Sequence, residues 1–178
     1  MPILLGTFSL SLHKENSFEI SGSCRYFHHK EGISKNVFTS EELKLYDGIN
    51  KKELYLAVLG NVFDVTKGAQ HYGPGKTYNI FIGRDASRNF IDGKFNQGDA
   101  SDDIINLSHK DLLSIHDWLR FYKKEYKKVG ILSGRHYNEN GSLTPYGKQV
   151  RSLIKKAQKI QAHVFGALEK VEELRGTG

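Results

Sequence analysis

Glycine recurs every few residues between positions 68 and 98, and this spacing limits what the middle of the chain can fold into. The interrupting residues are Gly68, Gly73, Pro74, Gly75, Gly83, Gly93 and Gly98. Glycine loses more conformational entropy than other residues on entering a helix, and proline lacks the amide donor that helices and sheets need. The segment is therefore predicted to form only short helices and turns, an arrangement that suits a pocket.

Helix and strand signals precede this segment. Residues 39–42 read Thr-Ser-Glu-Glu, a capping box that predicts a short helix ending near Gly48. The stretch LYLAVLGNVFDVT has two apolar runs around Gly60-Asn61, and both residues tolerate the positive φ angles of a hairpin turn. Strands are therefore predicted near 54–59 and 62–65.

A longer helix and a closing strand are predicted after the glycine-rich segment. Ser108, with Asp111 three residues later, is an N-terminal helix signal, and apolar residues then recur on one face as far as Tyr126. The helix is expected to end by Lys128. The apolar run at 129–132 indicates a strand.

The last part of the chain is predicted to be a helix with an apolar stripe. Thr144 and Pro145 suit the N-cap and the first helical position. Apolar residues then alternate spacings of three and four, the period of a coiled-coil seam: Val150, Leu153, Ala157, Ile160, Val164, Ala167, Val171 and Leu174. Either the chain's own domain or another chain must cover this stripe.

The length of the chain indicates how it divides into domains, and its charge distribution indicates which partners to expect. A chain of 178 residues suits one core with additions, so we expect an N-terminal segment at 1–35, a pocket-bearing domain at 36–133, and a linker with the amphipathic helix at 134–178. The net charge is +6, and its densest basic run, 123–128, lies at a helix end, where cations complement the helix dipole. Nucleic acid is therefore not an expected partner.

The single cysteine and the N-terminal segment argue against a disulfide-bonded protein, a cysteine-based metal site and a signal peptide. Cys24 is the only cysteine, so neither an intrachain disulfide nor a cysteine-based metal site is expected. The partly apolar stretch at 2–12 lacks a basic n-region, so the chain shows no convincing signal peptide.

No catalytic motif is found. The sequence has no nucleophile elbow, zincin pair or Walker loop. The stretch GPGKT resembles the end of a phosphate loop, but Ala69 and Gln70 occupy the positions around the required upstream glycine. The chain is therefore not expected to be an enzyme.

Two tyrosines flank the Gly-Pro-Gly turn. Ferric iron can displace the proton of a phenol, and tyrosine is one of the known haem-iron ligands, so Tyr72 and Tyr78 are candidate ligands. The turn lets the backbone approach a flat ligand, and the apolar residues at 80–82 can wall it. The spacing alone favours tyrosines that only pack.

Five motifs occur in order along residues 38–132: FTSEEL, YLAVLGNVFDVTKG, HYGPGKTY, GRDASRNF and HDWLRFYKKEYKKVG. Together they resemble the membrane-associated progesterone receptor family, a branch of the cytochrome b5-like fold, and within it the neuferricin group. GRDASR after the tyrosine-containing turn is the most specific of them. The resemblance implies an α+β, cytochrome b5-like domain whose short helices form a haem pocket, with a C-terminal helical extension.

The resemblance also implies a cofactor and its ligands. The cofactor is haem b (iron protoporphyrin IX), held non-covalently, with Tyr78 at the position of the axial iron ligand. Tyr72 matches a tyrosine that supports the pocket by hydrogen bonding, and Tyr126 matches a further pocket tyrosine. Glu125 departs from the family's best-known member, which has lysine there, so Lys124 or Lys127 would have to pair with a haem propionate.

His71 is the rival axial ligand, because it lies near the first histidine of the cytochrome b5 motif His-Pro-Gly-Gly. The second histidine of cytochrome b5 has no counterpart in residues 91–103, which argues against bis-histidine ligation. Ligation by His71 would indicate a b-type electron-transfer protein serving membrane-bound oxidases. A pocket without haem would indicate a scaffold for a steroid-like ligand or for protein partners.

The expected role is haem-dependent regulation or signalling, because an anionic phenolate ligand favours ferric iron over rapid electron shuttling. For neuferricin-like proteins the resemblance implies the endomembrane system or secretion, and promotion of neuronal differentiation. A homodimer is expected either through an open face of the haem or through the helix at 145–175.

Overall fold

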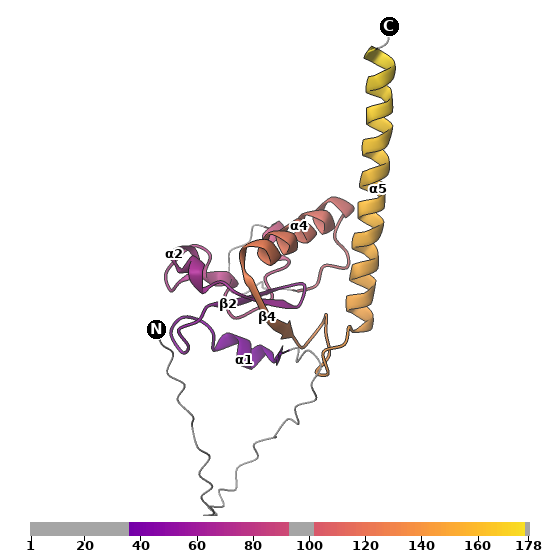
Figure 1. Ribbon diagram of the computed structural model, residues 1–178. Helices are drawn as coiled ribbons and strands as arrows, with labels where there is room; N and C mark the ends of the chain where they lie inside the picture. The colour runs from indigo at the N-terminus through magenta and orange to yellow at the C-terminus, as the bar shows by residue number, and fades with distance from the viewer. Residues whose placement is uncertain (1–35, 93–101, 177–178) are drawn as a thin grey trace, which may run out of the picture. The chain divides into compact units, whose positions relative to one another are not determined.

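The computed structural model describes residues 36–92 and 102–176, and they include every predicted helix and strand (Figure 1). The expectations for residues 1–35, including Cys24 and the signal-peptide assessment, lie outside the described residues. The elements, in chain order, are β1 (Val37–Phe38), α1 (Ser40–Lys44), β2 (Tyr55–Val58), β3 (Asn61–Asp64), the 3₁₀ helix η1 (Thr66–Gly68), α2 (Ala69–Tyr72), the 3₁₀ helix η2 (Asn79–Phe81), α3 (Asn89–Asp92), α4 (His109–Glu125), β4 (Lys127–Leu132) and α5 (Pro145–Gly176).

The four strands form one mixed sheet in the order β1-β4-β3-β2. β4 pairs antiparallel with β3 and parallel with β1, and a register shift between Val62 and Phe63 adds a bulge to the β3–β4 ladder. β4 begins at Lys127, two residues earlier than the sequence indicated, because pairing with Asp64 extends it. The predicted combination of strands and helices in an α+β fold is confirmed.

The β2–β3 hairpin turns one residue earlier than predicted. Val58 pairs with Asn61, so the two turn residues are Leu59 and Gly60, with φ angles of 50° and 69°. Leucine rarely adopts positive φ, and such a conformation costs about 1–3 kcal/mol unless the surroundings hold it. Here the Leu59 amide donates to Ser87 Oγ at 2.7 Å, and the Gly60 amide donates to an Asp85 carboxylate oxygen at 2.6 Å.

The sheet has a core on each face, as the alternation of side chains along a strand requires. Leu56 and Val58 on β2 face the larger core, which also contains residues of α2, η2, α4 and α5. Ala57 on β2 faces a smaller core with Leu43 of α1 and Val62 of β3. Accordingly, α4 and α1 lie on opposite sides of the strands in Figure 1.

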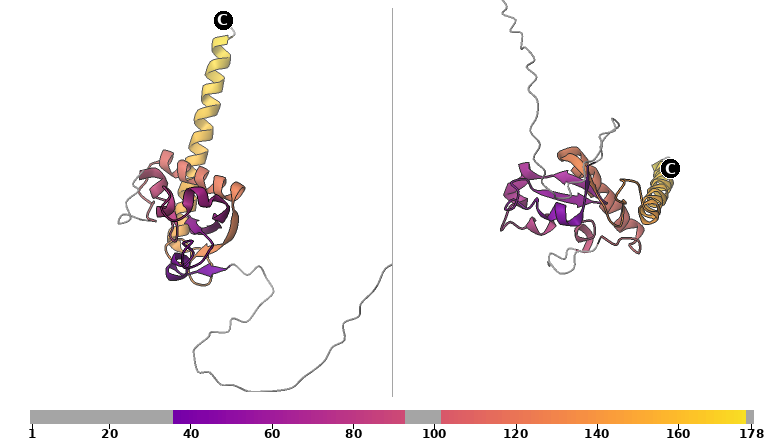
Figure 2. Two further views of the ribbon diagram at one scale, coloured as in Figure 1. Left: turned by 90° about the vertical axis from the view of Figure 1, so that its left-hand side faces the viewer. Right: turned by 90° about the horizontal axis from the view of Figure 1, so that it is seen from below.

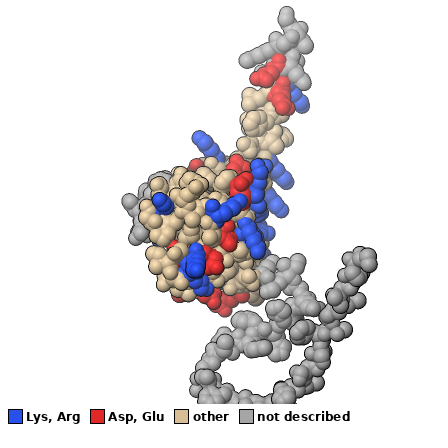
Figure 3. All heavy atoms as spheres, turned by 60° about the vertical axis from the view of Figure 1, so that its left-hand side comes forward, with Lys and Arg blue, Asp and Glu red and all other residues tan. Residues whose placement is uncertain are grey.

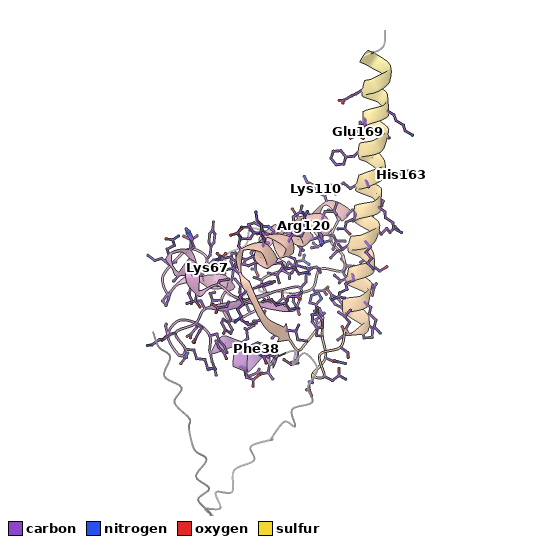
Figure 4. All side chains as sticks on the ribbon, in the orientation of Figure 1. Phe38, Lys67, Lys110, Arg120, His163 and Glu169 are labelled. Atoms are coloured by element: carbon purple, nitrogen blue, oxygen red, sulfur yellow. The ribbon has the colours of Figure 1, made fainter. Side chains whose placement is uncertain are left out.

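The first half of α5 packs on the domain, whereas the described side chains after Ala157 are largely exposed. Val150, Ile154 and Ala157 are buried, whereas Ile160 and Val164 are 42% and 53% exposed. Figure 2 shows α5 beside α4, and Figure 4 labels His163 and Glu169 on the part of α5 that extends past it. The side chains of Val171 and Leu174 lie outside the described residues. The chain's own domain therefore covers only the first part of the predicted stripe.

None of the helices among the described residues combines the length and the apolar character needed to span a membrane. α5 has 32 residues, but charged side chains recur along it from Lys148 to Glu172.

Candidate functional site

Aromatic side chains from four elements line one cavity of about 410 Å³ on the α4 side of the sheet. Its lining residues come from α2, η2, α3 and α4 and from the residues that border them: His71, Tyr72, Tyr78, Phe81, Asn89, Phe90, Trp118, Phe121, Tyr122 and Tyr126. All except His71 and Asn89 carry a Tyr, Phe or Trp ring. We call this cavity the aromatic pocket. It confirms that the glycine-broken segment, together with α4, surrounds a pocket.

The Gly-Pro-Gly turn brings the two predicted tyrosines to the same wall. α2 ends at Tyr72, and Gly75, with a φ of 76°, lets the chain reverse. The Tyr78 amide then donates to the His71 carbonyl oxygen at 3.1 Å, and the Asn79 side-chain amide donates to the Tyr72 carbonyl oxygen at 2.9 Å. As a result, the rings of Tyr72 and Tyr78 lie 6.0 Å apart between centroids.

A pair of hydroxyl groups lies at the base of the aromatic pocket. Tyr72 Oη and Tyr122 Oη are 2.9 Å apart, and the two residues are 6% and 1% exposed. Burial raises the pKa of Tyr72 to about 12, although the hydrogen bond to Tyr122 acts in the opposite direction. Burial also raises the pKa of Tyr122, and the hydrogen bond to Tyr72 adds to the rise. Both phenols therefore stay protonated at neutral pH.

Tyr122 is the hydrogen-bond partner that the sequence did not identify. It lies on the apolar face of α4 and is buried there. A tyrosine rather than a phenylalanine at a fully buried position implies a partner for its hydroxyl, because buried polar atoms are hydrogen-bonded. That signal indicates that a partner exists but not which residue it is.

The rim of the aromatic pocket is open to solvent. Tyr78, Trp118 and Phe121 are 41%, 39% and 42% exposed, an unusual degree of exposure for three large rings around one cavity. Tyr78 stacks on Phe81 with 5.8 Å between centroids and 11° between planes, which orients its ring. Trp118 stacks on Phe90 at 5.0 Å. The exposed rings therefore form a preorganised apolar surface.

Tyr126 lies in the aromatic pocket as the residue that follows α4. Its ring is 6.2 Å from that of Tyr72, edge to face. Lys67 Nζ lies 5.0 Å from the centroid of the Tyr126 ring, a cation–π contact. Lys67 belongs to the motif YLAVLGNVFDVTKG but was not a predicted pocket residue; Figure 4 labels it on η1.

The two lysines that were expected to replace the family lysine do not line the aromatic pocket. Lys127 is exposed on β4, opposite Asp64 of β3. Lys124 borders a neighbouring surface depression, which shares only Phe121 with the aromatic pocket.

His71 lies at the same rim as Tyr78. It is exposed, its ring centroid is 6.4 Å from that of Tyr78, and its Nε2 is 3.2 Å from Gln70 Nε2. It is the only histidine in the lining of the aromatic pocket. The geometry therefore offers one imidazole, not the two of a bis-histidine site.

The GRDASR run fixes one wall of the aromatic pocket through hydrogen bonds. The Asp85 carboxylate accepts from the Gly60 and Ser87 amides. Arg88 Nη1 donates to the Asp103 carbonyl oxygen at 2.7 Å. The run thus ties α3 to the hairpin turn and to the segment before α4.

The comparison with protein families agrees with this arrangement. Residues 39–136 match the family described as "Cytochrome b5-like Heme/Steroid binding domain". The chain belongs to this family. The cytochrome b5-like fold expected from the motifs is therefore confirmed, and the matched residues contain the whole aromatic pocket.

Relatives of this cytochrome b5-like chain include proteins named neuferricin. A neuferricin homolog of Drosophila pseudoobscura pseudoobscura is 47% identical over 130 residues, which are 72% of this chain and 46% of that protein. Neuferricin of Danio rerio is 45% identical over 134 residues, which are 75% of this chain and 50% of that protein. The chain thus spans about half the length of the curated relatives it matches.

A solved structure has the same fold. A hypothetical protein from Arabidopsis thaliana, described as having a cytochrome b5 like fold, is 34% identical, with a TM-score of 0.52. The match covers 61% of this chain and 100% of that protein. The shared part is therefore the cytochrome b5-like domain.

Proposed function

We propose that the aromatic pocket binds haem b, that Tyr78 is the axial ligand of its iron, and that the protein is a haem-dependent regulatory protein rather than an enzyme. The observation that carries the proposal is the group of exposed rings around one aromatic cavity, which a flat apolar macrocycle would cover. Membership of the haem/steroid-binding family points the same way.

The pocket suits haem iron, which the porphyrin already coordinates, better than a metal ion held by protein side chains alone. Among the described residues, no group of three or more His, Cys, Asp and Glu side chains is placed to hold a metal ion. Four ring nitrogens of a porphyrin would leave only axial positions for the protein, and one phenolate or one imidazole is enough for that. Haem, when bound, would supply a ferric centre whose potential the axial ligand sets.

Tyr78 suits the role of ligand better than Tyr72. Burial raises the pKa of Tyr72 to about 12, and its hydroxyl is already paired with Tyr122, so forming a phenolate there is costly. Tyr78 is 41% exposed at the rim and stacked on Phe81, so its hydroxyl can reach a ligand without breaking a buried hydrogen bond.

Lys67 is a candidate partner for a haem propionate. It is an exposed cation whose Nζ lies 5.0 Å from the ring centroid of the pocket residue Tyr126, although Lys67 itself, like Lys124 and Lys127, is not among the lining residues. Replacing Lys67 by Met should weaken haemin binding by up to about fivefold, because exposed ion pairs contribute ~0.2–1 kcal/mol. Lys52→Met, another exposed lysine, is the matched control and should leave binding unchanged.

A haemin titration followed by absorbance tests the proposal on the wild type, Tyr78→Phe, His71→Ala and the control Tyr46→Phe. We expect a ferric high-spin Soret band that Tyr78→Phe abolishes and that the other two variants retain. Loss in His71→Ala alone would support the electron-transfer alternative, with membrane-bound oxidases as candidate partners. Absence of a Soret change in every variant would refute haem binding.

A steroid-like ligand is the second candidate. The paired hydroxyls of Tyr72 and Tyr122 at the base of an otherwise apolar cavity could bind a carbonyl or hydroxyl group at the end of a rigid ring system. The family description names both ligand classes. Titration with progesterone, monitored by Trp118 fluorescence, tests this candidate: saturable quenching by a protein that shows no Soret change with haemin would favour the steroid over haem, and no saturable quenching would refute it.

The biological role proposed from the resemblance is regulatory. A phenolate ligand favours the ferric state, which suits haem sensing or haem-dependent association better than electron shuttling. Location in the endomembrane system or secretion, and a contribution to neuronal differentiation, remain proposals taken from neuferricin-like proteins. Immunolocalisation of the full-length protein and its depletion in differentiating neurons would test them.

Self-association is proposed through haem or through the uncovered part of α5. A truncation at Thr144 would not separate these routes, because it removes Val150 and Ile154 from the core. Truncation after Gln158 keeps the buried residues of α5 and removes Val164 and its exposed neighbours. Molar mass measured with and without haemin then separates the routes, and a dimer that survives the truncation would refute association through α5.

A further inference from the structure

A second cavity, of about 360 Å³, lies between α4, α5 and the hairpin turn. It shares no lining residue with the aromatic pocket. From α4 it takes His116, Leu119 and Lys123, which recur at spacings of three and four on one face, whereas the aromatic pocket takes Trp118 and Tyr122 from another face. Its volume lies within the range of small-molecule sites, ~300–1,000 Å³. We call it the α4–α5 cavity.

The charged residues of the α4–α5 cavity are all cationic. Lys123, Arg151 and Lys155 line it, and no Asp or Glu does. None of the three forms an ion pair with an acidic group of the described residues. Figure 3 shows Lys and Arg side chains gathered along the edge of the folded body from which α5 extends. Three like charges around one cavity attract an anion.

The floor of the α4–α5 cavity is apolar. Leu59, Leu119, Val150 and Ile154 line it and are between 1% and 8% exposed. A free inorganic anion would gain nothing from such a floor, whereas an apolar group attached to the anion would be removed from water there.

One buried polar atom of the α4–α5 cavity lacks a partner. His136 lines the cavity and is 4% exposed, and its Nε2 has no hydrogen-bond partner among the described residues. Buried polar atoms are nearly always hydrogen-bonded, and exceptions call for an explanation. Arg151 Nη2 donates to Tyr137 Oη at 3.0 Å, a bond that holds the guanidinium at the cavity.

We propose that the α4–α5 cavity binds an amphiphilic anion, with its carboxylate or phosphate group at Lys123, Arg151 and Lys155 and its hydrocarbon part on the apolar floor. His136 Nε2 would provide or accept a hydrogen bond at the inner end. The same chemistry occurs in a fatty acid and in a lipid phosphate headgroup. This site is independent of haem binding.

Isothermal titration of the full chain with dodecanoate, below its micelle concentration, tests the proposal. The wild type should bind saturably, and Lys123→Gln/Lys155→Gln should weaken binding about tenfold, because the double variant removes two exposed cations that would each strengthen binding of the anion a few-fold. Lys156→Gln, an exposed lysine of α5 outside the lining, is the matched control and should bind as the wild type does.

Further ligands identify the class of anion. Tighter binding of dodecyl phosphate than of dodecanoate would assign the site to phosphate headgroups, and the reverse would assign it to fatty acids; both support the proposal. Three results would each overturn the proposal. These are equal affinity for dodecanol and dodecanoate, an equal loss of affinity in the Lys156→Gln control, and binding of inorganic phosphate as tight as that of dodecyl phosphate. Unchanged far-UV circular dichroism of the variants shows that they fold.

Discussion

The hydroxyl pair of Tyr72 and Tyr122 should stabilise the domain measurably. Tyr122→Phe leaves the Tyr72 hydroxyl, in a residue only 6% exposed, without its partner at 2.9 Å. An orphaned buried hydroxyl costs ~1–3 kcal/mol, so the free energy of unfolding should fall by about that amount, and Tyr72→Phe should have a similar effect. The double variant removes both groups and leaves no orphan. Its loss should be smaller than the sum of the two single losses by ~1 kcal/mol or more.

Urea unfolding of the four proteins at neutral pH measures this coupling. Tyr46→Phe is the matched control: Tyr46 stacks on Tyr55 at 4.1 Å between centroids, and no hydrogen bond of its hydroxyl is present within the described part of the chain. It should cost less than ~0.5 kcal/mol. Additive losses in the two pocket variants, within ~0.3 kcal/mol, would refute the reasoning, because independent hydroxyls have no coupling energy.

Three more outcomes are expected. Burial raises the pKa of Tyr72 to about 12, above its ordinary value of 10.0. The free energy of unfolding should therefore keep its full value below pH 10 and fall as the pH rises towards 12, because the unfolded chain loses this proton first. Tyr72→Phe should reduce that loss in urea melts recorded as a function of pH. Gly147→Ala places a methyl group against the His136 carbonyl oxygen and should lower the free energy of unfolding by ~1–3 kcal/mol in urea. Thermal melts should show a ~2–5 kcal/mol loss for the buried Ile154→Ala but under ~0.5 kcal/mol for the exposed Val164→Ala; equal losses would contradict the packing of α5.

The helix starts were predictable from the sequence because their causes are local. The Thr39 hydroxyl accepts from the Glu42 amide at 3.1 Å, and the Glu42 carboxylate accepts from the Thr39 amide at 2.8 Å, as the capping box predicted. Ser108 caps α4 through the Asp111 amide at 3.2 Å. Each bond joins residues three positions apart, so neighbouring residues contain all the information that it requires.

The hairpin turn was less predictable. Glycine and asparagine were expected to occupy it, but Leu59 and Gly60 do. Ser87 and Asp85, more than twenty residues away in the sequence, hold the two turn amides and offset the strain at Leu59. A distant contact therefore overrode the local preference for residues that tolerate positive φ.

The sequence by itself determined the α+β composition, the helix starts and the placement of Tyr72 and Tyr78 around one turn, since these depend on periodicity, capping and turn chemistry within a few residues. Tertiary structure alone decided that Tyr72 bonds to Tyr122, 50 residues away, and that Lys67 rather than Lys127 approaches Tyr126. It also decided where the domain stops covering α5. Such contacts follow from how packed elements meet in space, and no pattern along one segment contains that information.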